Sequence, residues 1–115
     1  MKNNLTDQPR KFIVGKDKDI QISDYGTIQL KPNDMMSFKT DLGKEYDVAA
    51  KEWGFYATPS LNSRLVKEGF KTALVKNAQS QYFVMVVENE HMMLFEQYLE
   101  KEENQVVEWL DERKE

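Results

Sequence analysis

The segment from residue 53 to residue 64 holds the densest group of side chains that could bind a ligand. It joins aromatic rings to hydroxyl, amide and guanidinium groups at the expected start of a helix. An aromatic ring offers a flat face to a sugar or a base, and an arginine forms a forked pair with phosphate or carboxylate. Unpaired N–H groups at a helix start also attract anions. The segment therefore predicts an anion- or sugar-binding site. Its residues, with one lysine from the next strand, are Trp53, Tyr56, Ser60, Asn62, Arg64 and Lys71.

A structural interpretation of the same residues stays open. Ser60 stands where a helix cap belongs, and Trp53 and Phe55 are large enough to fill a core. Arg64 would then be an ordinary surface residue. Because the segment has no glycine-rich phosphate loop, the sequence licenses nothing more specific than an anion or sugar site.

Acid–base catalysis is the alternative chemistry. His91 lies at the expected start of a helix, just after Glu88 and Glu90, and Tyr56 carries an ionisable hydroxyl. With a carboxylate, these groups could serve a small sugar isomerase or lyase. A surface or capping histidine explains His91 equally well.

Composition excludes several function classes. The chain has 115 residues with no cysteine and one histidine, so disulfides, thiolate metal sites, a cysteine nucleophile and multi-histidine zinc sites are excluded. We expect no metal and no cofactor. Five Tyr, six Phe and two Trp are enough aromatic residues for one folded core.

Charge divides the chain into two unlike parts. Residues 1–76 carry 13 Lys or Arg against 10 Asp or Glu, whereas residues 77–115 carry 3 against 10. A nucleic-acid surface needs a dense basic face, so nucleic acid is excluded as a partner. The acidic C-terminal third is either a solvated helix face or a docking surface for a basic protein.

Targeting features point to the cytoplasm. The polar N-terminus lacks the apolar stretch of a signal peptide, and the longest apolar run, residues 82–87, is too short for a membrane span. We therefore expect a cytoplasmic protein without a membrane partner.

Hydrophobic alternation predicts strands in the first half of the chain. Residues 1–10 are expected to be a disordered arm, followed by a strand at 11–14 and a hairpin of residues 20–23 and 27–30. Residues 35–40 form the next strand, with Met36 and Phe38 facing the core. Residues 45–57 alternate with one phase change near Lys51, which indicates either a β-bulge or a break into two strands.

Helical periodicity appears twice in the second half. A helix is expected near residues 60–68, ended by Gly69, and another at 90–103. Residues 70–76 and 81–88 form strands, the second of them apolar enough to be central in a sheet. Residues 105–110 are ambiguous between helix and strand, and a short strand is favoured.

These elements predict a single α+β domain over residues 11–115. We expect a curved antiparallel sheet of about five to seven strands, or a small open barrel, with the two helices packed against it. If the 90–103 helix has a wider apolar face than the sheet covers, the excess would form a homodimer interface.

Three stretches carry a resemblance to a known group of proteins. They are residues 53–60 (WGFYATPS), 69–77 (GFKTALVKN) and 106–111 (VVEWLD). They resemble short uncharacterised bacterial proteins associated with surface-polysaccharide or nucleotide-sugar genes. The resemblance spans roughly residues 45–111. It implies a sugar-related accessory role and assigns no catalytic residue.

The sequence therefore predicts a small cytoplasmic, non-catalytic binding or accessory protein for sugar-phosphate or nucleotide-sugar metabolism. Its ligand would be an anionic or sugar molecule. The sugar isomerase or lyase, and a protein-binding module that uses the acidic C-terminal third, remain as alternatives.

Overall fold

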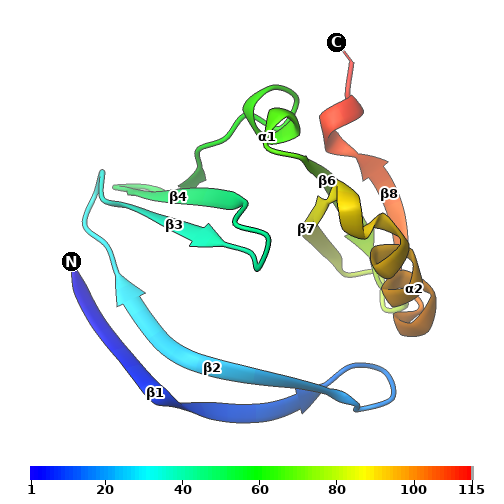
Figure 1. The fold of residues 1–115 in the computed structure, drawn as a ribbon, viewed down its shortest axis with the longest axis horizontal. Coiled ribbons are helices and arrows are strands. Elements are labelled where there is room, and N and C mark those ends of the chain that lie inside the picture. The colour runs from blue at the N-terminus through cyan, green and yellow to red at the C-terminus, as the bar shows by residue number, and fades with distance from the viewer. Residues whose placement is uncertain (115) are drawn as a thin grey trace. The chain divides into compact units, whose positions relative to one another are not determined.

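The structure, a computed structural model, describes residues 1–114 (Figure 1). Its internal contacts gather into two compact units, Met1–Thr58 and Pro59–Glu115. The sequence predicts one domain over residues 11–115, which stays a prediction. Each unit is described by itself.

A long two-stranded ribbon begins the N-terminal unit. Strand β1 (Lys2–Val14) pairs antiparallel with β2 (Ile20–Gln29), so residues 1–10, predicted as a disordered arm, lie in a strand. The predicted hairpin of 20–23 with 27–30 is wrong, because β2 runs through the expected turn without reversing. Gly26 permits this course: its φ is +115°, and an added Cβ would lie 2.0 Å from the Asn4 carbonyl oxygen.

A three-stranded antiparallel sheet completes the N-terminal unit. Its strands are β3 (Met35–Lys39), β4 (Glu45–Lys51) and β5 (Gly54–Ala57), with β4 in the centre. The phase change near Lys51 is a chain reversal, with Lys51 paired opposite Gly54. The predicted break into two strands is therefore confirmed, and the alternative, a β-bulge within one strand, is wrong.

The C-terminal unit holds the second three-stranded sheet. A short helix α1 (Arg64–Lys67) precedes β6 (Phe70–Lys76) and β7 (Tyr82–Glu88), and the strand order is β7-β6-β8. Figure 1 shows the three strands side by side. The prediction that residues 83–87 form the central strand is wrong, since β6 occupies the centre and β7 lies at an edge.

Helical and strand predictions near the C-terminus are confirmed. A single 3₁₀ turn η1 (Asn89–His91) leads into α2 (Met92–Glu102), and β8 (Gln105–Trp109) follows as the favoured short strand. The helix packs on the sheet through Phe95, whose ring lies 6.0 Å from the Trp109 ring in an edge-to-face arrangement. The last element is the 3₁₀ turn η2 (Leu110–Glu112).

The described residues form an α+β fold of antiparallel strands and two α-helices, as predicted. The expected single curved sheet or barrel is wrong, because the strands form three separate sheets of two, three and three strands. Alternation predicts that a strand buries one face, and it does not predict which strands become neighbours.

Buried apolar side chains are concentrated in the C-terminal unit. Leu65, Ala73 and Val75 are fully buried there. In the N-terminal unit the buried apolar residues are two alanines, Ala49 and Ala50. No helix within residues 1–114 combines the length and the apolar character that crossing a membrane requires.

Candidate functional site

The predicted ligand-binding residues are divided between the two units. Trp53 stands at the β4–β5 turn and Tyr56 on β5, both in the N-terminal unit, and Trp53 is 73% exposed. The other four belong to the C-terminal unit: Ser60, Asn62, Arg64 and Lys71. A common site for all six stays a prediction.

Ser60 caps the turn that leads into α1. Its Oγ accepts a hydrogen bond from the Arg64 N–H at 2.8 Å, and its carbonyl accepts one from the Leu65 N–H at 3.0 Å. These bonds satisfy N–H groups that a helix start leaves unpaired. Because Ser60 already accepts these bonds, its hydroxyl is engaged in structure.

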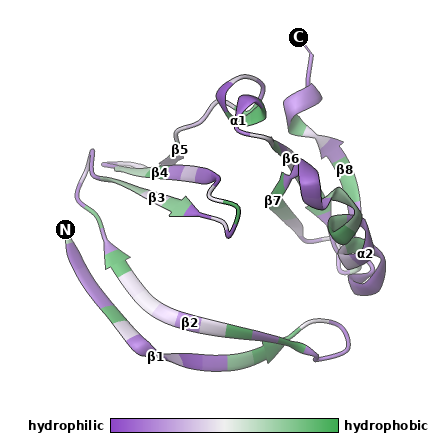
Figure 2. Cartoon of the chain, viewed as in Figure 1, coloured by the Kyte–Doolittle hydropathy of each residue, from purple (hydrophilic) through white to green (hydrophobic). Residues whose placement is uncertain are grey.

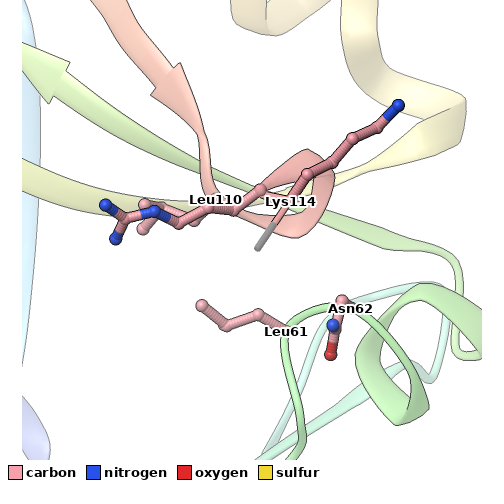
Figure 3. Close-up of a pocket in the computed structure, with 5 residues that line it drawn as sticks. Leu61, Asn62, Leu110 and Lys114 are labelled. Carbon is pink, nitrogen blue, oxygen red and sulfur yellow. The ribbon is translucent and has the colours of Figure 1, made fainter.

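Asn62 lines a hollow in the C-terminal unit. The hollow has a volume of about 410 Å³ and is open to solvent; it is lined by Leu61, Asn62, Leu110, Arg113 and Lys114. Figure 3 shows the two leucines facing each other across it, while the Lys114 side chain and the Asn62 amide extend away from its centre. Small-molecule sites depend on polar groups that converge on the ligand. In this hollow the leucine side chains lie at the centre, and the Asn62 and Lys114 side chains point away from it.

Lys71 on strand β6 forms ion pairs with the C-terminal turn η2. Its Nζ lies 3.0 Å from an Asp111 carboxylate oxygen, 2.5 Å from a Glu112 carboxylate oxygen and 5.0 Å from the centre of the Trp109 ring. The second Asp111 oxygen accepts the Thr72 N–H at 2.9 Å. Lys71 is thus part of an internal ion-pair cluster, which explains its place without a ligand.

Shifted pKa values follow these bonds. The hydrogen bonds that the Lys71 ammonium donates to Glu112 and then to Asp111 raise the pKa of Lys71. Burial alone would raise the pKa of Asp111, but the bonds from Thr72 and Lys71 outweigh it and lower that pKa. In the N-terminal unit, bonds from the Gly26 N–H and Arg10 lower the pKa of Asp24.

The acid–base candidates belong to different units. Tyr56 lies on β5 of the N-terminal unit and His91 on η1 of the C-terminal unit, and both are exposed. A catalytic acid and base must meet around one reacting group. The sugar isomerase or lyase therefore stays a prediction. Residues 1–114 also contain no group of three or more side chains placed to hold a metal ion.

One face of the β3–β4–β5 sheet gathers apolar side chains that the strand register brings together. Phe38 pairs with Tyr46, and Ala50 pairs with Phe55, and paired residues of antiparallel strands point to the same side. We call this surface the aromatic face. Its residues are Met36, Phe38, Tyr46, Val48, Ala50, Phe55 and Ala57.

The aromatic face is exposed at its two phenylalanines. Phe55 is 73% exposed and Phe38 is 54% exposed, so the interpretation of Phe55 as a core residue is wrong. Ala50 on the same face is buried, and Tyr46 and Val48 are half-buried. The exposed apolar surface of this face therefore lies at Phe38 and Phe55.

Sequence reasoning found part of this face and missed the rest. The alternation of residues 46, 48 and 50 and of 55 and 57 predicted shared faces within 45–57. Phe38 was assigned to the core, since alternation identifies which residues share a side and does not identify what covers it.

Comparison of the chain with protein-family models, with curated proteins and with solved structures found no match. The residues and their geometry therefore carry the functional argument.

Proposed function

We propose that this chain is a non-catalytic binding protein whose aromatic face docks an apolar surface of another polypeptide. The observation that carries the proposal is the exposure of Phe38 and Phe55 on a sheet face that also holds Met36 and Val48. Contiguous exposed apolar surface marks interaction sites, and aromatic residues supply much of the binding energy at protein interfaces.

The chemistry of the face favours a polypeptide over a sugar. The aromatic face contains no charged residue, and its hydroxyl group belongs to Tyr46. Burial raises the pKa of Tyr46, so the phenol is neutral at pH 7. Sugar and anion sites need several polar groups aimed at the ligand, whereas an apolar protein surface needs contact area and rings.

The experiment is affinity capture by the full chain from cells that encode it, comparing two substitutions on adjacent residues. Phe55→Ser removes a ring from the aromatic face, and Tyr56→Ser removes one from the opposite face, because neighbouring strand residues point to opposite sides. We expect Phe55→Ser to lose the partner and Tyr56→Ser to keep it. Equal retention by both variants would refute the proposal.

A change in protein stability would not explain a loss of the partner by Phe55→Ser. Phe55 is mostly exposed, so its removal takes little apolar surface out of a core and should change the free energy of unfolding by less than about 1 kcal/mol. A thermal melt of each variant checks that both proteins remain folded.

A second candidate function is binding of a small anionic molecule, such as a sugar phosphate, at the hollow. The observation in its favour is that Asn62 of the predicted segment lines the hollow together with Arg113. A screen of sugar phosphates by thermal shift tests it: Arg113→Ala should abolish the shift, and Arg64→Ala, outside the hollow's lining, should preserve it. A role in nucleotide-sugar metabolism rests on the resemblance described above.

A further inference from the structure

Strand β7 has one unpaired edge. In the order β7-β6-β8 it pairs with β6 on one side, and no strand within residues 1–114 pairs with its other side. The Asn77 N–H donates to the Gln81 carbonyl, and the Asn89 N–H donates to the Gly69 carbonyl.

These two bonds define which backbone groups point outward. Bonded and non-bonded pairs alternate along an antiparallel ladder, so the odd-numbered residues of β7 bond to β6. The N–H and C=O groups of Tyr82, Val84 and Val86 therefore face away from the sheet. They form a regular row of donors and acceptors at the free edge.

Strand β7 lacks the features that usually protect an edge. Charged residues, proline, backbone irregularities or a short strand length prevent most free edges from pairing with another chain. Strand β1 contains Pro9 and charged residues, β2 contains Asp24 and Gly26, and β8 contains Glu108. Strands β3 and β5 have five and four residues.

By contrast, residues 82–87 of β7 include no charge, proline or glycine. The strand is hydrophobic along most of its length in Figure 2. Tyr82, Phe83 and Val84 are among the exposed large apolar residues, and Val84 is 62% exposed. An edge of this kind is suited to pairing with another strand.

We propose that β7 pairs antiparallel with β7 of a second copy of this chain. The outward groups place Val84 opposite Val84 of the second copy on the twofold axis, and Tyr82 opposite Val86. The two β7-β6-β8 sheets then form one continuous six-stranded sheet. This dimer uses a different surface from the aromatic face and does not depend on the proposed function.

Two observations favour a second copy over an unrelated strand. An antiparallel pair of identical strands is self-complementary about a twofold axis, and the uncharged run avoids placing like charges opposite each other.

A single engineered cysteine tests the register. The chain has no cysteine of its own, and residues opposite each other in a bonded antiparallel pair have Cα atoms about 5.5 Å apart, within reach of a disulfide. We expect Val84→Cys to form a disulfide-linked dimer within minutes of mild oxidation. Val107→Cys, an exposed control on β8, should form it at least about tenfold more slowly. Equal rates would overturn the proposed register.

Light scattering tests the interface without a new covalent bond. We expect the native protein to have twice the 13.6 kDa chain mass, and Val84→Pro and Val84→Lys each to weaken dimerisation by about 100-fold. Proline removes an N–H that the β6–β7 ladder does not use, and lysine places like charges on the twofold axis. Val84→Thr keeps the strand and should keep the dimer.

Three outcomes would overturn the proposal. One is a native protein that is monomeric at about 100 μM, well above the dissociation constants of most stable dimers. Another is a dimer that survives both Val84→Pro and Val84→Lys with unchanged affinity. The third is a dimer that Leu94→Glu dissociates while the Val84 variants do not, which would place the interface on α2 instead. Circular dichroism confirms that each variant is folded, and the two disruptive substitutions act by different means.

Discussion

Asp111 connects the end of the chain to its central strand. Its side chain is 5% exposed and accepts bonds from the Lys71 ammonium and the Thr72 N–H. A buried charge that loses its partners is costly, because neither water nor the protein then compensates it. The two donors therefore make this carboxylate a structural residue of the C-terminal unit.

Substitution of Asp111 should destabilise the protein. We expect Asp111→Ala to lower the free energy of unfolding by about 2–3 kcal/mol, since it leaves the Thr72 N–H without its acceptor and the Lys71 ammonium with Glu112 as its remaining carboxylate partner. Glu112→Gln is the matched control: its side chain is 60% exposed, and we expect a change below about 1 kcal/mol. Urea unfolding measures both, and equal losses would contradict the assigned role of Asp111.

The same carboxylate predicts a pH dependence. Because the folded-state pKa of Asp111 lies below the model-peptide value of 3.8, its stabilisation is present above that pH. It is lost as the pH falls through the lower folded-state pKa. Urea unfolding between pH 5 and pH 2 (about the range in which such a carboxylate titrates) should show a steeper loss of stability in the native protein than in Asp111→Asn. Parallel pH profiles would argue against this linkage.

At the scale of single residues, sequence reasoning predicted Lys71 as a ligand-binding cation and did not predict its ion pairs with Asp111 and Glu112. Its carboxylate partners are 40 and 41 positions away along the chain. These ion pairs form because β6 and β8 are adjacent strands of one sheet. The local spacing of residues in the sequence does not predict which strands are adjacent.

The prediction that Ser60 is the N-cap of the helix is wrong, because α1 begins at Arg64 and its N-cap is Ser63. The Ser60 hydroxyl nevertheless accepts the N–H of Arg64, the first residue of the helix.

Among the elements, α1 depends on one buried side chain. Leu65 is 0% exposed, whereas its neighbour Val66 is 41% exposed. Removing a buried leucine costs transfer free energy and leaves a cavity. We expect Leu65→Ala to lower the free energy of unfolding by about 2–4 kcal/mol and Val66→Ala by less than about 1 kcal/mol. Chemical denaturation checks the pair, and similar costs would contradict this packing.

The β1–β2 ribbon depends on a glycine. An added Cβ at Gly26 would collide with the Asn4 carbonyl oxygen, whereas one at Gly54 meets no atom within 4 Å, although both residues have positive φ. We expect Gly26→Ala to speed amide hydrogen exchange in β1 and β2 by about tenfold or more, beyond the effect of backbone strain alone. Gly54→Ala carries the strain without the collision and should leave that exchange unchanged.

Element positions were largely predictable, and sheet neighbours were not. The residues of β3, β6, β7, α2 and β8 all followed from periodicity and end signals. The apolar run in β7 suggested a central strand because it has no polar alternation, yet β6 lies in the centre. An apolar edge strand gives the same pattern as a buried one, and the distinction depends on pairing between distant segments.

For the whole molecule, the two units differ in how they are stabilised. The C-terminal unit has a buried core around Leu65, Phe70 and Val75, whereas the buried apolar residues of the N-terminal unit are two alanines. A two-stranded ribbon without further cover is only marginally stable. We expect backbone amides of β1–β5 to exchange faster than those of β6 in the isolated protein, and comparable protection would contradict this difference.

The aromatic face is the central claim of this account, and a photo-crosslinking amino acid tests it most directly. Placed at residue 55 in cells that encode the protein, it should form a covalent adduct with a partner polypeptide that mass spectrometry identifies. Placed at residue 56, on the opposite side of the same strand, it should form little or none. Adducts of equal yield at both positions, or none at residue 55, would contradict the aromatic face as a docking surface.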